Sequence, residues 1–369
     1  MSGTSLDGVD GVAVEFARSS DEPPLRVVSH AYVGFEAPLQ AELLALNRSS
    51  GDELHRAALA ANALARSYAT VVELLLVDSG FDPQRIAAVG CHGQTVRHRP
   101  GEFDGTGYTV QLNAPALLAE LCGIDVVADF RSRDVAAGGQ GAPLAPAFHR
   151  AMFGRGDQPV AVLNLGGMAN ISCFGAGGND VGFDCGPGNA LLDLWCSAET
   201  GRPFDRNGAW AATGRVDARL LQILLGEPFL AQVPPKSTGR DLFHREWLDA
   251  QLATAACAGR IPGEDVQATL AEMTAQVCAD ALRSHGRGAS ELVVCGGGAF
   301  NGDLLARLGR LVAPASVVSS GARGLAPDHV EAVAFAWLAR AFTQRSPGNI
   351  PAVTGADGPR VLGALYPAG

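Results

Sequence analysis

The stretch Val160-Ala-Val-Leu-Asn-Leu-Gly-Gly-Met-Ala-Asn-Ile-Ser-Cys-Phe174 decides the fold. Its β-rich run 160–165 is followed by the glycine turn Gly166-Gly167 and by a second β-rich run over 169–174, an order that predicts paired strands. A third strand is expected over 181–183, with a helix beginning at Asn189. The pattern continues with a helix over 265–284, an apolar strand over 292–295 and helices over 301–311 and 329–342.

The first half of the chain follows a similar order. Residues 11–14 and 25–33 are typical of antiparallel strands, and 53–77 has the periodicity of a long helix. A short strand over 86–90 ends in the polar segment Cys91-His-Gly-Gln-Thr95. Two such units predict an α/β fold with two similar lobes and a ligand-binding cleft between them. Two unrelated α/β domains are the alternative.

Composition excludes several classes of protein. Of the 369 residues, 47% are hydrophobic and the net charge is −10, which argues against a nucleic-acid binder because phosphate backbones are held by clustered Lys and Arg. No leader is apparent, and no segment is expected to cross a membrane. The eight cysteines lie singly and predict buried thiols in a reducing compartment. Lysine occurs only at Lys236, without the spacing of a P-loop.

Four motifs carry possible chemistry. In Ser2-Gly-Thr-Ser-Leu-Asp-Gly-Val-Asp10 the glycines permit close approach to phosphates, and Asp7 can hold a magnesium ion through water. The alternative there is a hairpin turn at Asp7-Gly8. Asn164 to Asn170 offers a second phosphate-wrapping turn or a plain glycine turn. Asp184 follows a strand and suits a general base, or it caps its own turn. The arginines in 128–134 can orient a hydroxyl-rich or carboxylate ligand, or form surface ion pairs.

Taken together in this order, these segments resemble the anhydro-N-acetylmuramic acid kinase family. The resemblance rests on ten motifs that span essentially the whole chain: Met1 to Asp10, Cys91 to Thr95, Asp129 to Asp134, Gly138 to Pro143, Asp184 to Asn189, Pro235 to Arg240, Asp265 to Leu270, Cys295 to Gly298, Glu331 to Trp337 and Pro347 to Pro351.

The resemblance implies a duplicated actin-like and hexokinase-like ATPase fold with mixed five-stranded sheets. It also implies an enzyme that uses ATP and Mg²⁺ to open 1,6-anhydro-N-acetylmuramic acid with water and to phosphorylate the freed 6-oxygen, in cell-wall sugar recycling. The product would be N-acetylmuramic acid 6-phosphate. A cytoplasmic homodimer is expected, with the amino sugar and ATP as its ligands and with no nucleic-acid or membrane partner.

Carried over motif by motif, the resemblance implies a role for each matching residue. Asp184 would be the base that activates water, and Glu331 would assist it. The candidates for ATP and its phosphates are Gly3, Thr4, Ser5, Leu6, Asp7, Gly8, Val9, Asp10, Asn164, Gly166, Gly167, Gly297 and Gly298. The candidates for the sugar are His92, Gln94, Asp129, Arg131 and Gln140.

The chain departs from the family pattern in two places. Family members usually carry a short apolar strand before Met-Ser-Gly-Thr-Ser, so we expect either that this core strand is absent or that the start is misassigned. The family tends to have Gly-Asp where this chain has Leu112-Asn113, so no sugar contact is assigned there. The expected lobes are 1–157 and 158–369, with the last ~25 residues packing back on the first lobe.

Two other functions stay open at this point. One is a kinase of the same fold for another small sugar or carboxylic acid, because a fold does not select a ligand. The other is a nucleotide-gated scaffold without catalysis. The candidate base Asp184 and its partner Glu331 argue against a scaffold, and turnover of ATP with the anhydro sugar would separate the three functions.

Overall fold

The computed structural model describes residues 1–3, 6–17, 24–156, 158–175, 180–239, 242–255, 259–286 and 288–369. The chain divides into two compact units. Unit 1 comprises Met1–Met152 and His329–Gly369, and unit 2 comprises Phe153–Asp328. Unit 1 therefore takes up the chain from His329 onward, a longer C-terminal segment than the one expected from the sequence.

Unit 2 is built on one mixed sheet of five strands in the order β11-β10-β7-β8-β9. β7 (Val160–Leu165) lies at its centre, antiparallel to β8 (Met168–Phe174) and parallel to β10 (Glu291–Cys295). β9 (Val181–Pro187) and β11 (Ser316–Ser319) form the two edges. The predicted strands 160–165 and 169–174 are confirmed. The predicted strand 181–183 is too short, because pairing with β8 continues as far as Pro187.

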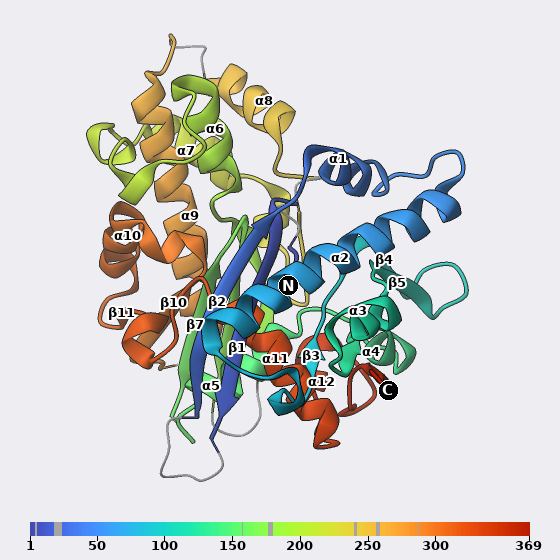
Figure 1. Cartoon of the computed structure of the whole chain (residues 1–369). Coiled ribbons are helices and arrows are strands. Elements are labelled where there is room, and N and C mark those ends of the chain that lie inside the picture. The colour runs from blue at the N-terminus through green and yellow to red at the C-terminus, as the bar shows by residue number, and fades with distance from the viewer. Residues whose placement is uncertain are drawn as a thin grey trace. The chain divides into compact units, whose positions relative to one another are not determined.

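Two helices cover one face of this sheet. α9 (Gly263–His285) and α10 (Gly302–Val312) bury Cys278, Leu304 and Leu308 against strand residues such as Leu163. A second core joins α6 (Ala190–Thr200), α7 (Ala218–Leu225), α8 (Arg245–Ala255) and the first half of α9 (Figure 1). The short 3₁₀ turns of unit 2 are Arg206–Gly208, Ala211–Thr213, Pro228–Ala231, Gly297–Phe300 and Ser320–Arg323.

The described strands of unit 1 form three smaller sheets. β1 (Gly8–Phe16) and β2 (Leu25–Gly34) make an antiparallel pair, as do β4 (Gln94–Pro100) and β5 (Gly107–Leu112). The third sheet has the order β12-β6-β3 and consists of Ala364–Tyr366, Val126–Ala128 and Val89–Gly90. β3 is shorter than the predicted strand 86–90, because only these two residues pair with β6. The prediction of an α/β fold with mixed sheets is confirmed.

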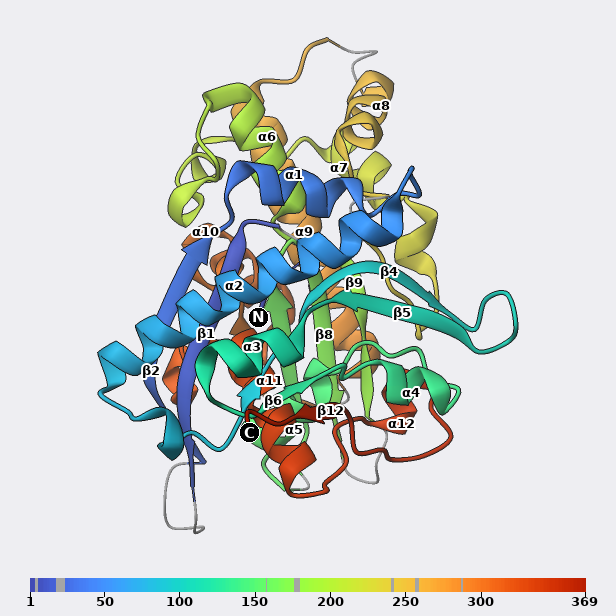
Figure 2. The same cartoon turned by 45° about the vertical axis from the view of Figure 1, so that its right-hand side comes forward.

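Helices pack on both sides of these strands. α2 (Glu53–Ser79) crosses the β1–β2 pair, as both views show, and α11 (Val330–Thr343) packs against β1, β3 and β6 (Figure 2). The remaining elements of unit 1 are α1 (Ala37–Ala45), the 3₁₀ turn Pro83–Arg85, α3 (Pro115–Cys122), α4 (Ser132–Ala136), α5 (Ala145–Phe153) and α12 (Pro351–Thr354).

One helix corrects an expectation about membrane spans. α2 is long and apolar enough to cross a membrane by length and composition, whereas no such segment was expected from the sequence. Its residues Leu64, Ala65, Tyr68 and Val71 are buried in a core of unit 1. Core helices of soluble proteins meet the same criterion, so the feature is weak support for a membrane span.

Candidate active site

The glycine turn between β7 and β8 is fastened to the start of α6. The carbonyl oxygens of Gly166 and Gly167 accept hydrogen bonds from the N–H groups of Asn189 and Gly188, each over 2.9 Å. Asn189, which precedes the first turn of α6, also donates from its side-chain Nδ2 to the Leu165 carbonyl at 2.9 Å. A Cβ built on Gly167 would meet nothing within 4 Å, so its backbone is open to a ligand.

The Gly296-Gly297-Gly298 segment lies beside the same turn. Gly296 has a φ of +77°, and a Cβ there would come within 2.3 Å of the side-chain oxygen of Asn164. A Cβ on Gly298 would lie 2.6 Å from that of Leu165. Unit 2 therefore brings together Asn164, Gly166, Gly167, Gly297 and Gly298, the five candidates for ATP that the sequence placed in this half.

Asp184 lies within β9, opposite Asn170 of β8, rather than after the end of a strand as predicted. Its Oδ2 accepts a hydrogen bond from the backbone N–H of Thr238 at 3.0 Å, and its own N–H donates to the Lys236 carbonyl at 3.2 Å. Asp184 therefore does not cap its own turn through that contact. Burial raises the pKa of this carboxyl to about 6, although the Thr238 N–H and the Lys236 ammonium both act to lower it.

Lys236 holds the segment that contacts Asp184. Its ammonium donates to the carbonyls of Phe229 and Leu230, at 3.2 and 2.9 Å, and lies 4.7 Å from the ring centre of Phe229. These contacts fix the only lysine of the chain close enough to Asp184 for the two charges to influence each other. The raised pKa of Asp184 and its rigid strand suit a general base that works near neutral pH.

In unit 1, His92 and Arg131 form a buried pair. The Nε and Nη2 atoms of Arg131 lie 3.1 and 3.0 Å from His92 Nε2, and Nη1 donates to the Gly141 carbonyl at 2.9 Å. A guanidinium only donates, so Nε2 must accept and the proton of the neutral ring is on Nδ1, which faces the Ser2 carbonyl at 3.4 Å. Burial first, and then the charge of Arg131, lower the pKa of His92 well below its usual range.

Gln94 carries an unused acceptor in the same region. Its side chain is 1% exposed and its Nε2 donates to the Gly3 carbonyl at 3.1 Å. The other side-chain atom, Oε1, is buried and finds no hydrogen-bond partner among the described residues. A buried unsatisfied oxygen is costly, so this atom is suited to accept a hydrogen bond from a ligand hydroxyl.

The described residues at and before the start of β1 differ in how far their side chains are exposed. Gly8 opens β1, which rules out the alternative of a hairpin turn at Asp7-Gly8. Leu6 and Val9 bury their side chains in the cores of unit 1. Asp10 Oδ1 lies 2.7 Å from His30 Nε2. The Asp7 side chain is exposed. Of the predicted phosphate-binding residues, Thr4 and Ser5 lie outside the described residues.

Glu331 lies in the first turn of α11, near enough to Arg131, Asp10 and Asp7 for their charges to act on it. Partial burial raises the pKa of its carboxyl, the positive charges of the chain's amino group and Arg131 oppose that rise, and Asp10 and Asp7 add to it. Its side chain still reaches solvent. Asp129, at a φ of +57°, and Gln140 are also exposed, and Asp129 Oδ1 accepts from the Ser132 hydroxyl. Unit 1 thus holds Glu331 and the five sugar candidates.

Comparison with known proteins decides the family. A sequence model described as "Anhydro-N-acetylmuramic acid kinase" matches residues 1–368. The chain belongs to the anhydro-N-acetylmuramic acid kinase family. It is 56% identical over 388 residues to the anhydro-N-acetylmuramic acid kinase of Albidiferax ferrireducens and 58% identical over 373 residues to that of Variovorax paradoxus. Both alignments cover 100% of this chain and 98% of the relative.

One solved structure is a more distant match than these two relatives. A ROK family glucokinase from Streptomyces griseus in complex with glucose and AMPPNP aligns with 85% of this chain and 92% of its own. The sequence identity is 15% and the TM-score is 0.37.

Two parts of the anhydro-N-acetylmuramic acid kinase site were missed by reasoning from the sequence. Lys236 served as evidence against a P-loop and, with Thr238, as part of a family motif. The contact of this segment with Asp184 was not predicted, although the isolated lysine after two prolines was a usable signal. Asn189, which fastens the glycine turn, was expected only as the start of a helix. No group of three or more His, Cys, Asp or Glu side chains within the described ranges is arranged to hold a metal ion.

Proposed function

We propose that this chain opens the 1,6-anhydro bridge of anhydro-N-acetylmuramic acid with water and phosphorylates the freed 6-oxygen from ATP. The family match over residues 1–368 supports the substrate and the reaction. The observation that carries the mechanism is Asp184, a carboxylate on a rigid strand whose pKa is raised to about 6. Such a group is charged at neutral pH and still basic enough to take a proton from water.

In this mechanism Asp184 accepts one proton from a water molecule as the water oxygen bonds to the anomeric carbon. The bond from that carbon to the bridging oxygen breaks on the opposite face of the sugar. The bridging oxygen stays on carbon 6 and bonds to the γ-phosphorus of ATP, and the bond to the β-phosphate oxygen breaks to release ADP. Asp184 then returns its proton to solvent.

The sugar would be oriented by residues of unit 1. Arg131 keeps a positive charge at neutral pH, because burial lowers its pKa only to about 10, and it can pair with a carboxylate or hydroxyl. Gln94 Oε1 can accept a hydrogen bond from a sugar hydroxyl. Glu331, with its raised pKa, can exchange a proton with a reacting group. Asp129, Gln140 and His92 complete the proposed contacts.

The phosphates of ATP would be bound by backbone. The Gly166-Gly167 turn is hydrogen-bonded to the residues at the N-terminus of α6, where the helix dipole favours negative charge. Asp7 is an exposed carboxylate, a hard oxygen ligand of the kind that holds Mg²⁺ through water, so the residues present fit this ion. When bound, Mg²⁺ would neutralise charge that develops on the phosphates. A cytoplasmic homodimer remains part of the proposal.

A direct assay tests this function against a kinase for another sugar. The protein is incubated with ATP, Mg²⁺ and either anhydro-N-acetylmuramic acid or an ordinary hexose, and ADP release and sugar consumption are both measured. We expect ADP and N-acetylmuramic acid 6-phosphate in equal amounts only with the anhydro sugar. Turnover with the hexose instead would support a kinase for another sugar. No turnover with either sugar would support a scaffold without catalysis.

A further inference from the structure

The carboxylate of Asp134, in α4, is fully buried within unit 1. Its Oδ1 accepts hydrogen bonds from Asn349 Nδ2 at 2.7 Å and from the Thr354 hydroxyl at 2.8 Å. Its Oδ2 accepts from the Gly141 N–H at 2.7 Å. A buried carboxylate is costly unless donors of this kind surround it, so these three contacts hold Asp134 and its partners in place together.

The partners of Asp134 belong to two segments that are far apart in the sequence, the loop 138–141 and the C-terminal segment 349–357. Backbone hydrogen bonds join the same two regions. The Gln140 N–H donates to the Thr354 carbonyl at 2.7 Å, and the Asp357 N–H donates to the Ala137 carbonyl at 2.8 Å. A Cβ on Gly139 would come within 2.3 Å of Asp134 Oδ2, so the loop can approach this closely only with glycine there.

The loop 138–141 connects Asp134 to Arg131. Gly141 donates its N–H to Asp134 and accepts from Arg131 Nη1 through its carbonyl, at 2.9 Å. The Nε and Nη2 atoms of Arg131 contact His92 Nε2, which leaves further N–H groups of the guanidinium for a ligand. Because a guanidinium is a rigid planar fork, its direction is set by these partners, and a shift of Gly141 would turn it.

We propose that Asp134 is a positioning residue for the sugar site, because it fixes the loop 138–141 and, through Gly141, the direction of the Arg131 guanidinium. This role rests on the proposed function, in which Arg131 contacts the anhydro sugar. Asp134 is fully buried and acts on the sugar only through Arg131. Loss of its carboxylate should therefore weaken the sugar contact and leave nucleotide binding unchanged.

The first test replaces Asp134 by Asn. The amide offers one oxygen and one NH₂ group to donors that now meet two oxygens, so at least one of these donors would face another donor. We expect the KM for the anhydro sugar to rise roughly tenfold or more, and the Kd of an ATP analogue to stay within about twofold. The matched control is Asp357→Asn, at an exposed carboxylate of the C-terminal segment, which should change neither constant.

A pair of substitutions at Thr354 gives the answer even if Asp134→Asn fails to fold. Thr354→Val keeps the shape of the side chain and removes the hydroxyl that donates to Asp134, whereas Thr354→Ser keeps that hydroxyl. We expect Thr354→Val to raise the KM for the sugar roughly threefold and Thr354→Ser to leave it unchanged. Equal KM values for these two variants would overturn the role of the Asp134 contacts.

A double-mutant cycle distinguishes positioning through Arg131 from a general effect on the fold. Arg131→Lys keeps the positive charge but loses the fork that Gly141 and His92 hold. In that background, substitution of Asp134 or Thr354 should change the Kd of the sugar, measured by calorimetry, by less than about twofold. An effect as large as in the chain with Arg131 would overturn the proposal.

The unsubstituted protein, assayed in parallel, separates failure of this role from failure of the proposed function. If it turns over the anhydro sugar and Asp134→Asn has the same KM as Asp357→Asn, only the role of Asp134 is overturned. If the unsubstituted protein neither binds nor turns over the anhydro sugar, the proposed function fails and the positioning role fails with it.

Discussion

Two features of the Asp184 environment have opposite effects on the pKa of its carboxyl. Its carboxyl is withdrawn from water enough to raise its pKa to about 6, yet one oxygen accepts the Thr238 N–H, which favours the charged form. The balance leaves a base that is charged at neutral pH and fixed in direction by β9. This single residue carries the proposed hydrolytic step.

Replacing Asp184 by Asn separates catalysis from folding. The amide oxygen can still accept the Thr238 N–H, so the fold should persist, but the amide cannot take a proton from water. We expect turnover to fall by roughly 10²–10⁴ with nucleotide affinity nearly unchanged. Calorimetry with an ATP analogue and a coupled ADP assay measure the two effects. Near-normal turnover would remove Asp184 from the mechanism.

Lys236 should act on the pH dependence through Asp184. The lysine charge lowers the pKa of Asp184, so Lys236→Gln should raise that pKa and move the acid limb of kcat/KM to higher pH. Activity at pH 6 should fall roughly threefold and recover near pH 8. Lys236→Arg keeps the charge and should leave the limb in place. A loss of melting temperature in Lys236→Gln without any shift of the limb would mean that Lys236 is only structural.

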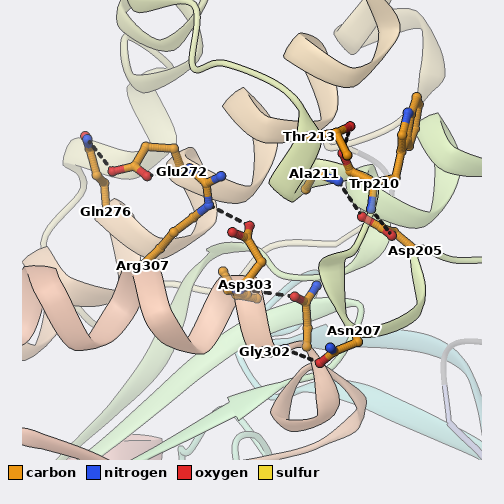
Figure 3. Close-up of polar contacts among 12 residues, drawn as sticks. Asp205, Asn207, Trp210, Ala211, Thr213, Glu272, Gln276, Gly302, Asp303 and Arg307 are labelled. Atoms are coloured by element: carbon orange, nitrogen blue, oxygen red, sulfur yellow. Dashed lines mark hydrogen bonds and ion pairs between the residues drawn. The ribbon is translucent and has the colours of Figure 1, made fainter.

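Among the elements of unit 2, polar contacts position the glycine segment before α10. Asn301 caps α10 by accepting the Leu304 N–H at 3.0 Å, and Asn207 accepts the Gly302 N–H at 3.0 Å. One turn further on, Arg307 pairs with Asp303 of its own helix at 2.7 Å and with Glu272 of α9 at 2.9 Å (Figure 3). These contacts hold α10 against α9 and so fix the direction in which Gly297 and Gly298 approach β7.

Arg307→Met should destabilise unit 2 strongly. The Arg307 side chain is 9% exposed, and its removal leaves two poorly hydrated carboxylates without their partner. We expect a loss of roughly 3–5 kcal/mol in the free energy of unfolding. The matched control is Arg245→Met, which breaks an exposed pair with Asp249 and should cost roughly 0.5 kcal/mol or less. Equal losses in urea melts of the two variants would contradict this account.

Elements could be predicted from the sequence where their own residues show an apolar run or a helical periodicity. β7 reads as a continuous apolar run because it is the central strand, and α9 and α11 show clear helical periodicity. The predicted bounds of a strand were wrong where its length depends on pairing with another strand. β3 is short because only two residues meet β6, and β9 is long because its pairing with β8 continues past a register shift near Asn170.

The same limit applied to the site. Glycines, Asp184 and Arg131 could be recognised as candidates because their chemistry is visible in one motif. The hold of Thr238 on Asp184, across 54 residues, and the pairing of Arg131 with His92, across 39, depend on the fold. A residue's partner at such distances in the chain is not encoded in the local pattern.

At the scale of the whole molecule, nucleotide binding should depend on Mg²⁺. Removing the ion with EDTA should weaken ATP binding at least about tenfold, because the triphosphate charge would then be met only by backbone groups. Asp7→Asn should raise the Mg²⁺ concentration required, and Asp129→Asn, at another exposed carboxylate of unit 1, should not. Titration calorimetry at several Mg²⁺ concentrations measures this. If ATP affinity changes neither with Mg²⁺ concentration nor in Asp7→Asn, the Asp7 carboxylate is not part of the metal site.

In the proposed reaction, one turnover couples water attack at the anomeric carbon to phosphorylation of the bridging oxygen. Turnover in H₂¹⁸O, followed by mass spectrometry of the sugar phosphate, tests it most directly, with unlabelled product kept in the same water to correct for exchange. We expect one ¹⁸O per product on carbon 1, none in the oxygen that bridges carbon 6 and phosphorus, and one ADP per labelled sugar. Product without ¹⁸O on carbon 1, or ¹⁸O in the phosphate ester bond, would contradict it.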